Sequence, residues 1–304
     1  DDAKAAAATL DIALTARGEH NGAPIPMCGV PAHSHEAYLA RLIKAGHRVA
    51  IADQTETPEQ AKKRAGSKAL VERAVVRVVT AGTLTEETLL DARAENWLVA
   101  IAATGGTLGI AAADISTGRF TLSAADPAML DAELARLGAA ELIAPEGFVA
   151  APAHAQLCAK SDFSSIATEK RLKQLFGVAT LDGFGDFDRA ELAAAGGLLA
   201  YLETAGQGAL PFLQPPARHR SDDHMLIDAA TRESLELTEA VGGGRKGSLL
   251  GCIDQTVTGA GARLLAADIA APLTDIPAIG ARLDRVQLFA DDAGLRETLR
   301  GQLK

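Results

Sequence analysis

The sequence has few of the residues that build cross-linked or membrane-embedded proteins. Its three cysteines are far apart among 304 residues, so neither a disulfide framework nor closely spaced zinc ligands are expected. No apolar run reaches the roughly 18 residues of a membrane span, and no signal peptide is visible, which favours a reducing cytoplasm. Aromatic residues make up only 4% of a chain that is 48% hydrophobic, so the core must be aliphatic and rich in alanine.

The net charge of −9 argues at first against nucleic acid, but the charges are unevenly placed. Residues 1–80 hold 11 Lys/Arg against 9 Asp/Glu, whereas residues 81–220 hold 10 against 17 and residues 221–304 hold 9 against 13. Most of the positive excess is a cluster set against Glu72 alone: Lys62, Lys63, Arg64, Lys68, Arg73 and Arg77. Salt screens carboxylates beyond about 8 Å, so the cluster can still contact phosphates. A solvated basic loop is the alternative.

The first 80 residues predict a small α/β domain that looks incomplete at its N-terminal edge. Ser34 and Gly46 are suitable ends for a helix over residues 35–45, and β-branched residues predict strands over 48–53 and 75–80. Three prolines and a glycine within residues 24–31 predict a stiff, extended loop with Met27 and Cys28 at its middle. A stiff loop costs little entropy when it docks, so it suits a surface that holds a partner in register, and an ordinary buried connection is the alternative.

Residues 81–95 are polar and predict a linker, and residues 96–220 predict a second α/β domain. Apolar runs separated by Gly-containing turns predict three strands, over 97–103, 108–113 and 119–123. A helix over 127–137, a fourth strand over 141–144 and helices over 169–176 and 188–204 follow. A three-stranded meander, a helix and another strand is the order of ribonuclease-H-like domains.

From residue 221 onward the pattern is helical only. Helices are predicted over residues 229–240, 248–257, 261–270 and 276–289, the last beginning at Asp275 with Pro277 behind it. No closure of a helical bundle is evident before Lys304. We therefore expect residues 221–304 to be the start of a larger helical domain.

Two motifs suggest ligands but fit other roles better. Residues 242–247 satisfy G-x-G-x-x-G, but they follow a helical segment, and Lys246 precedes Gly247 where a Walker loop needs Ser or Thr. A flexible loop is the better interpretation. His33 and His35 form H-x-H without a third ligand at a useful spacing, so loop and capping roles are expected.

Three carboxylates raise the alternative of a metal-dependent nuclease. A ribonuclease-H-like enzyme needs such groups close together to hold two metal ions, and Asp114, Glu133 and Glu141 are the candidates. Asp114 ends a predicted strand. Glu133, however, lies in a helix whose apolar stripe faces the sheet, so it is expected to point to water. Solvated charges are the preferred interpretation, and a protein-binding scaffold is a third possibility.

A series of stretches before and after the stiff loop at 24–31 resembles the bacterial MutS family of DNA mismatch-recognition proteins. The stretches occur in the same order as in that family. They are residues 10–18, 36–46, 49–54, 71–83, 114–120, 227–237 and 247–286. Each stretch alone is weak evidence, but their common order over nearly the whole chain is specific.

The resemblance implies three domains. Residues 1–80 match part of the mismatch-binding domain, 81–95 a linker, 96–220 the connector, which is not a nuclease in this family, and 221–304 the start of the helical core and lever. The family reads a mismatch with a Phe-x-Glu motif, which we expect upstream of Asp1, and we expect the clamp and the ATPase downstream. No catalytic residue, cofactor or metal is therefore expected here, while ATP and Mg²⁺ are implied for the full-length protein.

In this family the first domain lies along the minor groove near the mismatch. The resemblance therefore implies that Arg17, Arg73 and the tip Met27–Cys28–Gly29 are close to DNA, with His33 and Lys68 as weaker candidates. The implied partners are mismatched double-stranded DNA, MutL through the connector, and a second copy in a homodimer. No membrane is implied, and the location is the bacterial cytosol, near the nucleoid.

Overall fold

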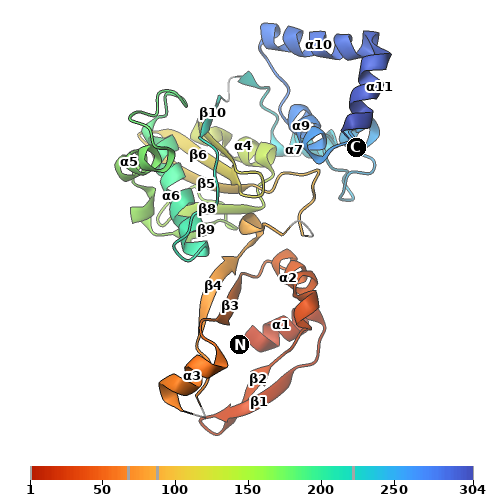
Figure 1. Cartoon of the computed structure of the whole chain (residues 1–304). Helices are drawn as coiled ribbons and strands as arrows, with labels where there is room; N and C mark the ends of the chain where they lie inside the picture. The colour runs from red at the N-terminus through yellow and green to blue at the C-terminus, as the bar shows by residue number, and fades with distance from the viewer. Residues whose placement is uncertain (1, 67–68, 87–88, 221–222, 304) are drawn as a thin grey trace.

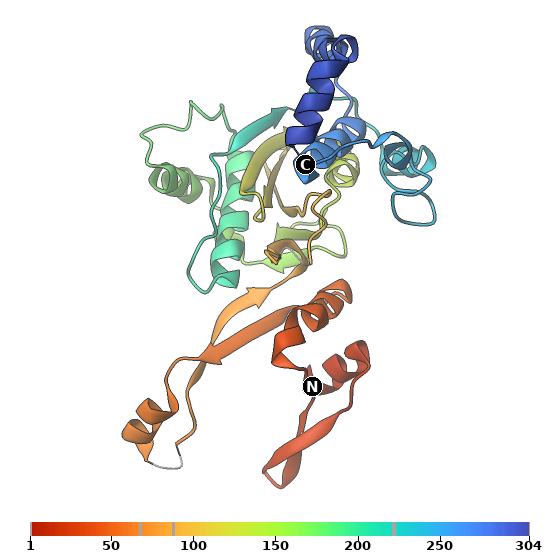
Figure 2. The same cartoon turned by 45° about the vertical axis from the view of Figure 1, so that its right-hand side comes forward.

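The computed structural model describes residues 2–66, 69–86, 89–220 and 223–303. Three regions follow one another along the chain: an N-terminal α/β region, a central sheet covered by helices, and a helical region (Figure 1). A second view preserves this arrangement, with the N-terminal region standing away from the other two (Figure 2). The predicted fold class, α/β followed by α, is confirmed.

The N-terminal region holds two separate antiparallel strand pairs, β1 with β2 and β3 with β4. Its elements are α1 (Asp2–Leu10), β1 (Thr15–His20), β2 (Ala23–Met27), the 3₁₀ helix η1 (Ala32–Ser34), α2 (His35–Lys44), β3 (Val49–Gln54), α3 (Pro58–Ala65) and β4 (Arg73–Val79). The predicted helix and both predicted strands are present. Leu39 and Ile43 of α2 are buried against Val79 and Leu84, which forms a small core.

The prediction of a stiff loop over residues 24–31 is wrong for its first half. Asn21 and Gly22 both have positive φ, 52° and 76°, which is the two-residue turn that suits a hairpin. Pro24 and Pro26 therefore lie inside β2. Pro24 lies opposite Glu19 and Pro26 opposite Ala16. Such pairs need no backbone donor from proline where they fall between the hydrogen-bonded pairs of the ladder.

The central sheet has six strands in the order β10-β7-β6-β5-β8-β9. The strands are β5 (Leu98–Thr104), β6 (Thr107–Asp114), β7 (Arg119–Ala125), β8 (Glu141–Pro145), β9 (Gln156–Cys158) and β10 (Ala217–Arg220). The predicted meander and fourth strand are confirmed, since β5, β6 and β7 pair antiparallel and β8 lies parallel to β5. The sequence did not predict β9 and β10, because three or four residues are too few for a periodic pattern.

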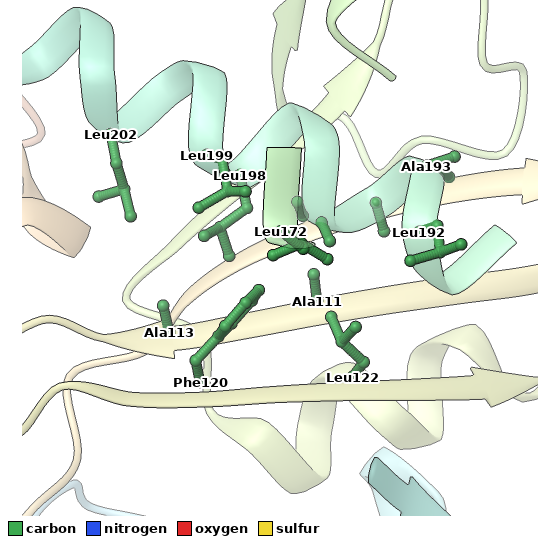
Figure 3. Close-up of a cluster of buried hydrophobic side chains, with 14 of the residues drawn as sticks. Ala111, Ala113, Phe120, Leu122, Leu172, Leu192, Ala193, Leu198, Leu199 and Leu202 are labelled. Atoms are coloured by element: carbon green, nitrogen blue, oxygen red, sulfur yellow. The ribbon is translucent and has the colours of Figure 1, made fainter. Parts of the chain in front are cut away.

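Helices cover both faces of this sheet. On one face α5 (Ser165–Phe176) and α6 (Arg189–Ala205) pack over an alanine-rich core, as composition predicted (Figure 3). On the other face lie η3 (Pro127–Met129) and α4 (Leu130–Leu137). The turn η4 (Lys160–Phe163) precedes α5. At Gly109 a Cβ atom would come within 2.0 Å of the Ala190 carbonyl group, so only glycine lets α6 approach β6 this closely.

The helical region is more broken than the sequence predicted. It contains α7 (Ala229–Ser234), α8 (Leu249–Ile253), α9 (Gly259–Ala270), α10 (Ile276–Asp291) and α11 (Ala293–Gln302). The predicted helices over 229–240 and 248–257 are too long, because Glu236 takes a left-handed φ of 46° and Asp254 leaves the helix to bond Thr256. The sequence did not predict α11. Among the described residues, no helix is both long and apolar enough to cross a membrane.

Candidate nucleic-acid interface

The hairpin of β1 and β2 stands free of the core. Every residue of β1 is exposed, and the hairpin turn lies at the end of the N-terminal region that points away from the central sheet (Figures 1 and 2). Arg17 was predicted in a loop, but it lies in β1, where the register with β2 shifts between Ala16 and Glu19. Gly18 takes a φ of 75° at this bulge, so the local irregularity re-aims an exposed guanidinium.

The predicted tip Met27–Cys28–Gly29 is the base of the hairpin. Met27 pairs with Thr15, at the opposite end from the Asn21–Gly22 turn. The Met27 side chain is 39% exposed, Gly29 is exposed, and Cys28 is half-buried. The Asn-Gly pair in the sequence is the signal that could have located the true tip.

The histidines of the H-x-H motif follow the hairpin in the chain. His33 is exposed in η1. His35, the first residue of α2, donates a hydrogen bond from Nδ1 to Ala32 O over 2.8 Å, within the turn that precedes the helix. Among the described residues, no cluster of side chains is suited to hold a metal ion.

The second projecting element is α3 at the far end of the β3–β4 ribbon. Thr57 Oγ1 accepts a hydrogen bond from Gln60 N over 3.2 Å, and Gln60 Oε1 accepts one from Thr57 N over 2.7 Å. This reciprocal cap, with Pro58 in the first turn, starts the helix at a defined residue. The sequence Thr-Pro-Glu-Gln carries that signal. Lys62 and Lys63 are exposed on α3. Arg73 is exposed at the start of β4, where it pairs with Gln54 of β3.

Two of the six clustered cations are neutralised. Arg64 pairs with Glu56 at 2.7 Å and with Glu72 at 3.2 Å, and the hydrogen bond from Arg64 holds the pKa of Glu56 below its usual value. Arg77 pairs with Glu86 at 2.8 Å. The expectation that Glu72 alone balances the cluster is therefore wrong, because the fold brings in acids from outside residues 62–77.

Together with Arg17, the other cations of the cluster are the candidates for contact with an anion. Lys68 lies outside the described residues. Arg17, Lys62, Lys63 and Arg73 form no ion pair within the described part of the chain. Arg17 lies on the hairpin, and the other three lie on α3 or at the adjoining start of β4. All four are exposed, so they are available to bind an external anion.

The three carboxylates considered for a nuclease do not converge. Asp114 is buried and accepts hydrogen bonds from Ser116 N at 2.9 Å and Ser116 Oγ at 2.6 Å. Glu133 was expected to point to water, yet it is 1% exposed, because it turns inward to accept a hydrogen bond from Arg136 Nε over 2.9 Å. Glu141 faces α6 on the opposite side of the sheet. Each carboxylate thus has its own partners, so the nuclease alternative is not supported.

The glycine-rich loop at residues 242–247 makes structural contacts. Arg245 donates to the Arg93 carbonyl oxygen over 2.6 Å and pairs with Asp254 at 3.3 Å. Arg93 itself pairs with Asp254 at 3.1 Å. The loop therefore ties the end of the 81–95 segment to the helical region, in agreement with the rejection of a phosphate-binding loop.

A cavity of about 610 Å³ lies between the central sheet and the helical region. Arg119, Arg136 and Arg232 contribute to its lining, together with His219 and His224, whose rings stack with centroids 4.6 Å apart. Burial and the charge of Arg136 lower the pKa of His219 to about 4. This imidazole is therefore neutral near pH 7, and it lies away from both projecting arms.

Three family models match consecutive parts of the chain. They are described as MutS domain I over residues 1–88, MutS domain II over 96–214 and MutS domain III over 230–304. Proteins named DNA mismatch repair protein MutS are similar throughout. The one from Zymomonas mobilis is 63% identical over 310 residues, covering 100% of this chain and 36% of the relative.

Two further relatives carry the same name. The protein from Erythrobacter litoralis is 58% identical, covering 99% of this chain and 35% of the relative, and that from Paracoccus denitrificans is 52% identical, covering 100% and 35%. The chain thus spans about a third of the length of these relatives.

Proposed function

The chain belongs to the MutS family of DNA mismatch repair proteins, and from this premise we propose that its N-terminal region contacts the backbone of mismatched duplex DNA. The observation that carries the proposal is the pair of projecting arms, the β1–β2 hairpin and the α3 element. Both are exposed, and both present cations without an ion-pair partner among the described residues. Exposed, unpaired Lys and Arg side chains are suited to displace counterions from phosphates.

We propose that Arg17 and Arg73 bind phosphates on the same duplex, together with Lys62 and Lys63. Phosphate contacts fix the register of a protein on DNA but read no sequence. The arms therefore supply affinity and orientation. Met27, Cys28 and Gly29 at the hairpin base, and His33 next to them, are the proposed neighbours of the sugar–phosphate backbone. A mismatched step is easier to deform than a paired one, so a duplex gripped at two places is most easily bent there.

Binding of the 304-residue chain to a duplex with one mismatch, measured by fluorescence anisotropy at several salt concentrations, tests this proposal. The double variant Arg17→Ala/Arg73→Ala should bind more weakly. The slope of log K against log salt is negative, and its magnitude should fall by about two. Lys170→Ala, an exposed cation on α5, is the matched control and should leave the slope unchanged. Unaltered slopes in the double variant, or no binding by the parent chain, would contradict the proposal.

The central region offers a surface for a protein partner. Exposed apolar side chains on the central region, such as Phe212 at 76% and Ile166 at 72% exposure, support a protein partner there, and we propose MutL. Retention of MutL by the immobilised chain without DNA, and its loss in Phe212→Ala, would support this. Homodimer formation, a cytoplasmic location and the use of ATP with Mg²⁺ by the complete protein rest on the family alone.

A further inference from the structure

The chain crosses from the N-terminal region to the central sheet through one buried turn. β4 ends at the fully buried Val79, and the 3₁₀ turn η2 (Ala81–Thr83) follows at once. Thr80 and Thr83 are 1% and 4% exposed, and Thr83 Oγ1 accepts a hydrogen bond from Thr80 N over 2.8 Å. A turn that is both internally bonded and buried is a rigid connection, whereas residues 81–95 were predicted to be a polar linker.

One carboxylate from the central sheet holds this turn. Glu141, the first residue of β8, accepts hydrogen bonds at Oε2 from Gly82 N over 2.9 Å and from Thr80 Oγ1 at short range. Its other oxygen, Oε1, accepts a hydrogen bond from Tyr201 OH of α6 over 2.5 Å. A single side chain therefore links the crossing turn, the start of β8 in the sheet and the helix that covers the sheet. Hydrogen bonds to an ionised carboxylate are among the stronger ones in proteins.

The surroundings leave this arrangement little freedom. A Cβ atom at position 82 would lie 2.9 Å from Glu141 Cβ and 3.0 Å from Leu98 Cβ, so the backbone passes too close for any side chain. Burial and the charge of Glu141 raise the pKa of Tyr201, so the phenol stays protonated and remains a donor. On the other side of the turn, Asn96 Nδ2 donates to Ala81 O over 2.8 Å.

We propose that Glu141 is a positioning residue that sets the orientation of the N-terminal region relative to the central sheet. The β3–β4 ribbon leads from this turn to α3 (Figures 1 and 2), so a small rotation at Thr80–Thr83 is amplified at the arm. The Arg77–Glu86 pair spans the turn and adds a second restraint. The inference rests on the proposed function only for its consequence on DNA, because the orientation itself is a property of the protein alone.

Amide hydrogen exchange on the 304-residue chain tests the contact. In Glu141→Ala the amide of Gly82 loses its acceptor, and its exchange should accelerate about tenfold or more. Glu146→Ala, which removes an exposed carboxylate just beyond the same strand, should leave that amide unchanged. Tyr201→Phe should have a smaller effect, since the bonds to Oε2 remain. Equal exchange at Gly82 in Glu141→Ala and in the parent chain would overturn the proposal.

Single-molecule energy transfer tests the orientation. Dyes at Lys62→Cys on α3 and Lys170→Cys on α5, in a background with the three native cysteines replaced by serine, should give one narrow distribution. Glu141→Ala should broaden or shift it, while Glu146→Ala should not. If Glu141→Ala fails to fold, Thr80→Val removes one hydroxyl donor of the same contact and should broaden the distribution in the same way. An unchanged distribution in a folded variant would refute the positioning role.

DNA binding separates this inference from the proposed function. If the parent chain binds no duplex, the proposed function fails, yet exchange and energy transfer still decide the role of Glu141. If the parent chain binds, Glu141→Ala should keep the same salt slope, because all of the proposed phosphate-binding side chains lie in the N-terminal region and are retained. A salt slope of smaller magnitude than that of the parent chain would mean that the arms themselves are damaged, which would count against a purely positioning role.

Discussion

Thr15 and Met27 face each other at the base of the N-terminal hairpin, where Thr15 Oγ1 donates a hydrogen bond to Met27 O over 2.9 Å. This pairing anchors the end of β2 at the base of the hairpin, and the Asn21–Gly22 turn lies at its opposite end.

The turn itself gives the first prediction. Gly22 has a φ of 76° with no atom within 4 Å of an added Cβ, so Gly22→Ala meets conformational strain without a clash. We expect a local cost of about 1 kcal/mol, seen as faster amide exchange in β1 and β2 with little change in global stability. Gly29→Ala is the control, because its site is also open and its φ is not left-handed. Equal effects of the two changes would contradict the turn assignment.

The ion pair on the α3 arm gives a prediction of opposite sign. Glu56→Gln removes one carboxylate partner of Arg64 and leaves that guanidinium freer to bind a phosphate. We expect tighter duplex binding at low salt and a steeper salt dependence. Glu59→Gln removes the same charge from α3 without an observed bond to Arg64, so its effect should be smaller. Salt titrations of both variants measure the difference, and weaker binding by Glu56→Gln would count against this surface.

The core of the central sheet predicts a large loss of stability at one glycine. Gly109→Ala would place a Cβ atom 2.0 Å from the carbonyl group of Ala190, which forces α6 away from β6. We expect a loss of about 2–3 kcal/mol or more in the free energy of unfolding. Gly183→Ala, where nothing lies within 4 Å of the new atom, should be close to neutral. Thermal unfolding of both variants tests the close approach of helix and strand.

His219 predicts a dependence of stability on pH. Its pKa is lowered from 6.5 to about 4 in the folded protein, so between these values the unfolded chain binds the proton and the folded chain does not. Stability should therefore fall as the pH drops from 6.5 toward 4, by at most about 3 kcal/mol from this group. His219→Gln should flatten that part of the curve in urea unfolding at successive pH values. An unchanged curve would show that His219 titrates normally.

The sequence predicted the central region well because its strands are long, continuous apolar runs between glycine turns. The strands β5, β6 and β7 therefore lie within about one residue of the predicted ranges at their first residues. The hairpin was missed although Asn21–Gly22 signals it, because the neighbouring prolines favour a loop when they are considered alone. Pro24 and Pro26 fit a strand only because β2 is an edge strand.

The sequence did not predict how the cations of the candidate site pair. Arg17 and Arg73 are exposed, and their place close to DNA stays a prediction. That Glu56 and Glu86 would neutralise Arg64 and Arg77 depends on how α3 and the turn after β4 fold back. Glu133 was mistaken for a solvated charge, although Arg136 stands three residues further along the helix, a spacing at which helical side chains pair.

Photo-crosslinking to one mismatched duplex tests the central claim most directly. A benzophenone reagent would be attached in turn at Arg17→Cys and Arg73→Cys, and as a control at Lys170→Cys, in the background without native cysteines. Both arm positions should crosslink to the same duplex, at separate backbone sites, and position 170 should not. Crosslinking from only one arm, or equally from position 170, would contradict the account in which the hairpin and the α3 arm hold one double helix together.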